Sequence, residues 1–277
     1  MDFFHELFHY RFLTHAFLAC ILSGVVCGVA GTYVVCRRLV FLSGGITHAS
    51  FGGIGIAYYL GLSPIGGAMV FALFSALGIE AFSARQRMRE DSAIGIVWAV
   101  GMAVGITFIC LTPGYAPNLM SFLFGSILTV TRADLWALAA LALFILTLFS
   151  VWMRSIMYVA FDSEYARSQG IPARFISSLM AVVVAATIVL TIRVAGVVLL
   201  ISLLTLPPVI VNALTQSYRR ITWYAVAVAA GGNLAGLWLS YRFDIPVGAM
   251  TIFVLAFALI AVKLVPLYRR HKNGCVA

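Results

Sequence analysis

The chain has 277 residues, of which 63% are hydrophobic and only 10% are charged, and its mean hydropathy is +1.06. A soluble domain carries roughly a quarter charged residues, so this composition excludes a water-soluble enzyme. The net charge of +9 comes from 18 Lys and Arg that lie in short clusters between apolar runs. That arrangement is typical of membrane topology and not of nucleic-acid binding. The sequence therefore predicts an all-α, polytopic membrane protein.

Nine apolar runs are long enough to cross a hydrocarbon layer roughly 30 Å thick. They cover residues 13–35, 44–62, 64–83, 92–112, 133–153, 175–192, 194–214, 221–241 and 246–266. The apolar stretch 119–130 is shorter and is expected to be re-entrant or interfacial, which leaves eight or ten crossings as alternatives. Because no polar domain or linker interrupts the runs, residues 1–277 are expected to form a single transmembrane domain.

The distribution of basic residues predicts the orientation. When the nine runs are threaded alternately across the membrane, most of the 18 Lys and Arg fall on one side. They lie in the loops 36–43, 84–91, 154–174 and 215–220 and after the last run. Basic residues concentrate on the cytoplasmic side of membrane proteins, so these loops and the C-terminus are expected to be cytoplasmic.

The second apolar run is the least lipid-like part of the chain. Gly45, Ala49 and Gly53 recur at four-residue steps, which produces a stripe of small residues that lets a neighbouring helix approach closely. His48 lies beside this stripe and is expected to face protein or a cavity, not acyl chains. Imidazole is a common ligand of divalent metals, and an ionisable group inside a membrane is a functional candidate. The alternative is an interhelical hydrogen bond at a tight contact.

The longest polar stretch follows Phe161 and predicts a short helix. Asp162 can cap its N-terminus, Glu164 suits the positive end of its dipole, and Gly170 can close it before Pro172. A helix of two turns is not stable in isolation, so it needs a surface on which to dock. The alternative is an ordinary capped loop.

Polar and helix-breaking residues in the last third of the chain are candidates for lining a pathway. Pro207 and Pro208 predict a local kink with exposed carbonyls. Asn212 and Asn233 are polar candidates for lining the path, although interhelical hydrogen bonding is the favoured role for both.

Several functional classes lack their signatures in this sequence. No GxxxxGK[ST] segment occurs, so the chain cannot bind ATP through a P-loop. No catalytic arrangement of residues is visible, so the chain is not expected to be an enzyme. The acidic residues fall in predicted loops or near the ends of runs, whereas ion-driven carriers usually need carboxylates within the membrane. An ion-gradient-driven secondary transporter of a small solute is therefore the weaker alternative.

Five segments in order resemble the permease subunits of bacterial zinc, manganese and iron(II) ABC importers. The first is the basic pair Arg37-Arg38 followed by GITHASFGG at 45–53. The others are EDSAIG at 90–95, LMSFLFG at 119–125 with LTVT after it, AGVVLLISLLTLP at 195–207, and DIPVG at 244–248. The resemblance implies a type II ABC importer permease that moves a divalent metal ion into the cytoplasm.

The resemblance also implies roles for individual residues. Glu164, Ala166 and Gly170 resemble the coupling helix that such permeases present to their ATPase, in a cytoplasmic loop covering about 155–174. His48 matches the family histidine implicated in metal passage. Many members carry an aspartate four residues before this histidine, where this chain has Gly44.

The same resemblance implies the partners. They are a cytoplasmic ATP-binding subunit, a second copy of the permease, and a metal-binding periplasmic or lipoprotein receptor that docks near Tyr115, Asn118 and Asp244. The protein is expected in the cytoplasmic (inner) membrane of a bacterium. The metal is then the substrate, ATP is bound by the partner subunit, and this chain holds no cofactor of its own.

Overall fold

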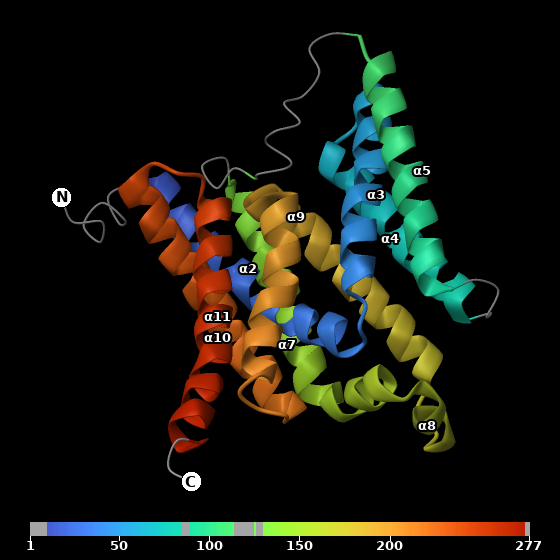
Figure 1. The fold of residues 1–277 in the computed structure, drawn as a ribbon. Coiled ribbons are helices and arrows are strands. Elements are labelled where there is room, and N and C mark those ends of the chain that lie inside the picture. The colour runs from blue at the N-terminus through green and yellow to red at the C-terminus, as the bar shows by residue number, and fades with distance from the viewer. Residues whose placement is uncertain (1–9, 85–88, 114–124, 126–129, 275–277) are drawn as a thin grey trace.

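The computed structural model describes residues 10–84, 89–113, 125 and 130–274. Within these ranges the chain forms nine α-helices (Figure 1). They are α2 (Arg11–Cys36), α3 (Val40–Tyr59), α4 (Pro64–Ala84), α5 (Glu90–Leu111), α7 (Arg132–Phe161), α8 (Ser163–Ser168), α9 (Ala173–Asn212), α10 (Tyr218–Phe243) and α11 (Val247–Gly274). The prediction of an all-α membrane protein is confirmed, and seven of these helices are long and apolar enough to span a bilayer.

The 40-residue helix α9 contains two of the predicted runs, 175–192 and 194–214. Its backbone leaves helical geometry at Gly196, where φ is 76° and ψ is 166°. Ser177, near the start of α9, bonds to Arg37 at the C-terminal end of α2, whereas Arg193 bonds to Asp134 at the start of α7. Beyond Gly196 the chain returns toward the C-terminal end of α2, because Leu204 packs against Gly31. The two runs are therefore two helical segments joined at Gly196.

The helix α7 is longer than the run 133–153 predicts. It begins with a capping box, in which the Thr131 hydroxyl accepts a hydrogen bond from the Asp134 backbone N–H and the Asp134 carboxylate accepts one from the Thr131 N–H. Its backbone bends at Trp152 (φ −110°, ψ 17°) and stays helical to Phe161. The first part of the predicted loop 154–174 is therefore a continuation of α7, and the next part is α8.

The backbone keeps helical φ/ψ at Pro207 and Pro208, where a kink was expected, and both residues are buried in the second segment of α9. A proline removes the N–H that would bond to the carbonyl four residues earlier, which for Pro208 is the carbonyl of Leu204. That carbonyl oxygen faces Gly31 of α2, where any Cβ would overlap it. The prolines are accommodated by close backbone packing against α2, and the break in α9 falls at Gly196 instead.

The long helices form two groups (Figure 1). One group contains α3, α4 and α5, and the other contains α2, α7, α9, α10 and α11, with the first segment of α9 packed against both α3 and α4. The helix α2 is central to the second group, where Gly24 packs on Ala230 and Gly28 packs on Val226 of α10. A Cβ at Gly28 would lie 2.6 Å from the Val226 Cα, so only glycine allows this approach.

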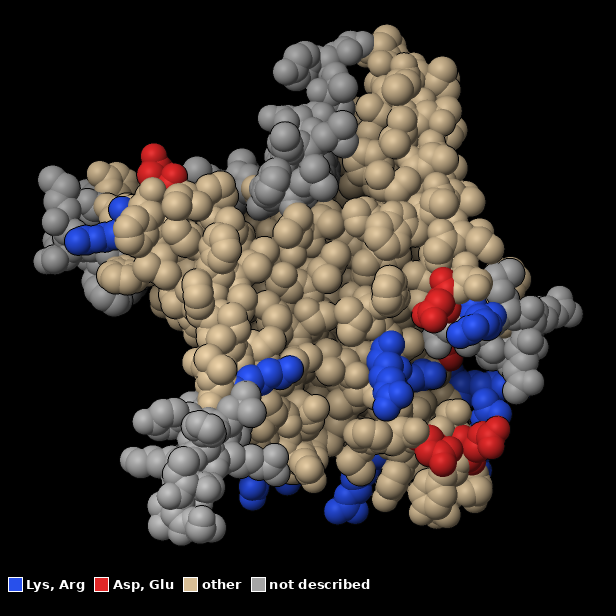
Figure 2. All heavy atoms as spheres, viewed as in Figure 1, with Lys and Arg blue, Asp and Glu red and all other residues tan. Residues whose placement is uncertain are grey.

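The two ends of the bundle differ in charge. The end where α2 finishes and α9 and α10 begin carries the arginines Arg37, Arg167, Arg174, Arg219 and Arg220, and we call it the basic end. Figure 2 shows blue side chains gathered over this lower part of the molecule. We call the other end, with the ion pair Arg193–Asp134 and with Asp244, the opposite end.

Candidate functional site

The small-residue stripe of α3 packs against the two neighbouring helices of its group. Gly45 lies against Ile94 of α5, and Ala49 lies against Gly101 of the same helix. Gly53 lies against Gly67 of α4, with the backbone carbonyl of Gly67 where a side chain at Gly53 would be. This close packing holds α3, α4 and α5 at short distances from one another.

The side chain of His48 is half-buried and stacks on the indole of Trp98 from α5. The two ring centroids are 4.4 Å apart and the ring planes differ by 3°. This parallel stack holds the imidazole ring against the indole. The neighbouring Gly44 has room for a side chain, because the nearest atom to a Cβ added there is 4.0 Å away, on Trp98. A Cβ alone is therefore not excluded at the position where many family members carry an aspartate.

Hydroxyl groups line a second face of α3 that sequence reasoning did not single out. Ser43, Thr47 and Ser50 are buried, and each donates a hydrogen bond to a backbone carbonyl three or four residues earlier, at 2.7, 2.6 and 2.7 Å. Ser50 also lines a cavity of about 240 Å³ between α3, α4 and α9, together with Tyr58 and Arg193. Serine is common in apolar runs, so the pattern alone did not distinguish this face.

The helix α8 has the caps that the sequence predicts. The Asp162 carboxylate accepts hydrogen bonds from the backbone N–H groups of Glu164 and Tyr165, at 3.0 and 2.9 Å. Gly170 takes the left-handed conformation with φ 76°, and its N–H donates to the carbonyl of Arg167 at 3.0 Å. This ending is typical of a glycine that terminates a helix.

The faces of α8 are differently exposed. Ala166 is fully buried, on the side of α8 that packs against α7 and α9. Glu164, Tyr165 and Arg167 are exposed at the basic end. The helix therefore rests on the bundle through its small residue and presents charged and aromatic side chains outward.

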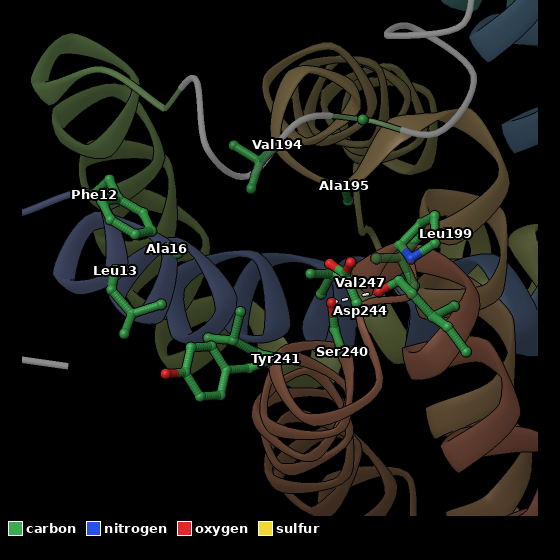
Figure 3. A pocket seen from close by; sticks show the side chains of 15 residues that line it. Phe12, Leu13, Ala16, Val194, Ala195, Leu199, Ser240, Tyr241, Asp244 and Val247 are labelled. Atoms are coloured by element: carbon green, nitrogen blue, oxygen red, sulfur yellow. Dashed lines mark hydrogen bonds between the residues drawn. The ribbon is translucent and has the colours of Figure 1, made fainter. Parts of the chain in front are cut away.

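The opposite end contains a cavity of about 540 Å³ between the start of α2, the bend of α9 and the end of α10. Figure 3 shows Phe12 and Leu13 of α2 across this space from Asp244 and Ser240. Asp244 has φ 55° and is exposed, and the Ser240 hydroxyl donates to the carbonyl of Ile245 at 2.5 Å. The other two residues predicted to meet a receptor, at 115 and 118, lie outside the described residues, as does most of the stretch 119–130.

An ion pair at the opposite end was not predicted from the sequence. Arg193 donates to the Asp134 carboxylate at 2.8 Å and so joins the bend of α9 to the capped start of α7. Residue 125 lies beside this bend, because a Cβ on Gly125 would meet the backbone of Ala195 and Gly196. The partners of the ion pair are 59 positions apart in the chain, so no local pattern could reveal them.

The predicted pathway-lining residues lie in different environments. Pro207 is buried in the second segment of α9, and Asn212 is exposed at the C-terminal end of that helix. Asn233 is buried in α10, and its side-chain amide donates to the Cys20 carbonyl at 3.0 Å and to the Ser23 hydroxyl at 3.1 Å. Asn233 therefore makes interhelical hydrogen bonds, the role that the sequence favoured for it.

The described part of the chain contains no group of three or more His, Cys, Asp or Glu side chains placed to hold a metal ion. His48 is thus a single imidazole within its own subunit. A lone imidazole holds a divalent cation weakly, so any binding here is transient unless a second molecule supplies further ligands.

Comparison with known proteins gives matches along most of the chain. The chain is 33% identical over 261 residues to the manganese transport system membrane protein MntC of Halalkalibacterium halodurans, covering 92% of this chain and 89% of that protein. It is 38% identical over 242 residues to a probable metal transport system membrane protein of Chlamydia pneumoniae, covering 85% and 83%.

Solved structures agree with these relatives. The structure of PsaBC from Streptococcus pneumoniae in complex with Fab matches with a TM-score of 0.83 and 25% identity, covering 94% of each chain. An ABC transporter in an inward-facing conformation shares the fold alone, with a TM-score of 0.73 and 14% identity. Residues 9–265 match the ABC 3 transport family. The resemblance inferred from the five segments is therefore confirmed, and the chain belongs to the ABC 3 transport family as a non-catalytic membrane permease.

Proposed function

We propose that this permease moves manganese(II) into the cytoplasm of a bacterium, driven by a separate ATP-binding subunit. The observation that carries the proposal is the match over nearly the whole chain to a relative named as a manganese transport membrane protein. Zinc and iron(II) are the competing cargoes. Uptake of radioactive manganese(II) in competition with each of these ions tests the choice, and stronger competition by zinc or iron(II) than by unlabelled manganese would reassign the cargo.

The basic end is the cytoplasmic face in this proposal, and the C-terminus lies on that side. The concentration of arginine there supports the orientation, because basic residues favour the cytoplasmic side. The exposed face of α8 with Glu164 and Arg167 is then the surface that docks on the ATPase. Residues 1–277 form one transmembrane domain, and two copies enclose one translocation pathway.

The opposite end then faces outward, toward the metal-binding receptor protein. The cavity beside Asp244 and the exposed segment after α10 are the surfaces available to it. ATP binding and hydrolysis bias the paired permeases between outward- and inward-facing arrangements, so that transport requires gating and transient coordination but no covalent chemistry.

Replacing Glu164 by alanine is expected to weaken co-purification with a P-loop ATPase and to lower metal uptake while the permease still inserts. Glu164 is exposed, so its loss should change the free energy of unfolding by about 0.5 kcal/mol or less. Gln169→Ala, on the next turn, is the matched control. Undiminished ATPase binding in Glu164→Ala, at the same membrane level as the control, would contradict a docking role for α8.

Two substitutions of His48 separate metal coordination from packing. His48→Ala removes both the imidazole nitrogens and the stack on Trp98, whereas His48→Phe restores an aromatic ring but supplies no nitrogen. If the nitrogens contact the passing metal, both variants lose radioactive manganese(II) uptake in reconstituted transporters. Normal uptake by His48→Phe would assign His48 to packing alone.

A further inference from the structure

The side chain of Arg37 joins the C-terminal end of α2 to the start of α9. Its Nη1 donates to the Tyr33 hydroxyl at 3.0 Å and to the Ser177 hydroxyl at 2.6 Å. The guanidinium also lies 5.9 Å from the centre of the Tyr33 ring. Tyr33 and Ser177 are 2% and 6% exposed, so these bonds form in a region with little water. Hydrogen bonds from a charged donor in such surroundings are among the stronger ones in proteins.

The link between α8 and the start of α9, which carries Ser177, is short and hydrogen-bonded. The N–H of Ile171 donates to the carbonyl of Ala166 at 3.0 Å, and the N–H of Ile176 donates to the carbonyl of Pro172 at 3.1 Å. Ala166 is itself fully buried on the side of α8 that packs against α7 and α9. Backbone hydrogen bonds therefore connect α8 to the first turns of α9, where the Ser177 hydroxyl accepts a hydrogen bond from Arg37.

On its other side Arg37 leads directly into α3. Only Arg38 and Leu39 separate it from the first residue of α3, and Arg38 holds a left-handed backbone conformation with φ 60°. The Leu39 N–H closes this turn on the carbonyl of Val34 at 2.8 Å. The end of α2 is thus joined by a two-residue turn to α3, the helix that carries His48.

We propose that Arg37 is a positioning residue that couples movement of α8 to α3, and thereby couples ATP hydrolysis to metal passage. The inference rests on the proposed docking of an ATPase on α8. Arg38 serves as a comparison for Arg37, because it carries the same charge on the same loop but its side chain is exposed. If Arg37 served only as a cytoplasmic positive charge that sets topology, the two arginines would be interchangeable in function.

The test compares Arg37→Gln, Ser177→Ala and the control Arg38→Gln in the complete transporter reconstituted in lipid vesicles. Radioactive manganese(II) uptake and ATP hydrolysis are measured on the same vesicles. Arg37→Gln and Ser177→Ala are expected to lower the manganese moved per ATP by about tenfold, with ATPase binding retained. Ser177→Thr, which keeps the hydroxyl, is expected to restore the ratio, and the double variant Arg37→Gln/Ser177→Ala is expected to be no worse than either single change.

Two results would overturn the inference. One is an equal ratio of manganese to ATP in Arg37→Gln and Arg38→Gln. The other is an unchanged ratio in Ser177→Ala, which removes a single hydroxyl and so still folds. Glu164→Ala is measured in parallel to separate the two proposals. If Glu164→Ala loses ATPase binding while Arg37→Gln stays coupled, only this inference fails; if Glu164→Ala retains ATPase binding, the proposed docking on α8 fails.

Discussion

Proline in place of Gly170 is expected to abolish metal uptake while the permease remains in the membrane. Proline fixes φ near −65° and has no N–H, whereas Gly170 has φ 76° and donates to the carbonyl of Arg167. The incompatibility costs about 3 kcal/mol or more. This free energy lowers the population of molecules in which α8 ends in its observed conformation at residue 170 by about a hundredfold. Uptake of radioactive manganese(II), normalised to membrane-inserted permease, measures the effect.

The control for this substitution is Gly170→Asn. Asparagine tolerates the left-handed conformation better than other residues with side chains, and no atom of the described residues lies within 4 Å of a Cβ built on Gly170. The asparagine variant should therefore transport metal at close to the original rate. Normal transport by the proline variant would mean that the observed C-terminal conformation of α8 is not needed for coupling to the ATPase.

A side chain at Gly196 is expected to destabilise the whole bundle. Gly196 has φ 76° and ψ 166°, a region of backbone conformation that is essentially restricted to glycine. Forcing another residue into it costs about 1–3 kcal/mol, and a reorganised bend would also disturb the Arg193–Asp134 ion pair beside it. In detergent, Gly196→Ala should lower the midpoint of thermal unfolding by about 5 °C.

Gly78→Ala provides the comparison for this prediction. Gly78 lies inside α4 in helical conformation, with no atom within 4 Å of an added Cβ. Alanine favours the helix over glycine, so this variant should unfold at the same temperature as the original protein or slightly above it. Equal midpoints for the two alanine variants would show that the bend does not depend on glycine.

The hydrophobic pattern was sufficient to locate the membrane helices. Five of the nine apolar runs lie wholly within a helix, and the other four extend beyond one by three residues or fewer. Helices form there because backbone groups in lipid must be satisfied inside the segment itself. The boundary between 192 and 194 falls close to the bend at Gly196. The pattern did not predict that α7 stays helical through Arg154 to Phe161, since a charged residue after an apolar run resembles the start of a loop.

Contacts between distant segments could not be read from the sequence. Local rules predicted the caps of α8, because Asp162 and Gly170 act on backbone groups a few residues away. The stack of His48 on Trp98 and the bond of Arg37 to Ser177 depend on how separate helices pack. The sequence drew attention to Pro207 and Pro208, but the break in the helical φ/ψ of α9 lies at Gly196, which the local pattern did not reveal.

The composition of α10 bears on how the protein is built during synthesis. This helix, which contains the predicted run 221–241, is the least apolar of the eight long helices. Contacts with two neighbouring helices help to hold α10 in the bundle. Asn233 donates hydrogen bonds to α2, and Gly232 and Gly236 pack against Leu255 and Thr251 of α11. Because α2 precedes α10 in the chain and α11 follows it, α2 is already in the membrane when α10 is synthesised, whereas α11 is not yet synthesised. We therefore expect α10 and α11 to insert together as a helical hairpin that packs against α2.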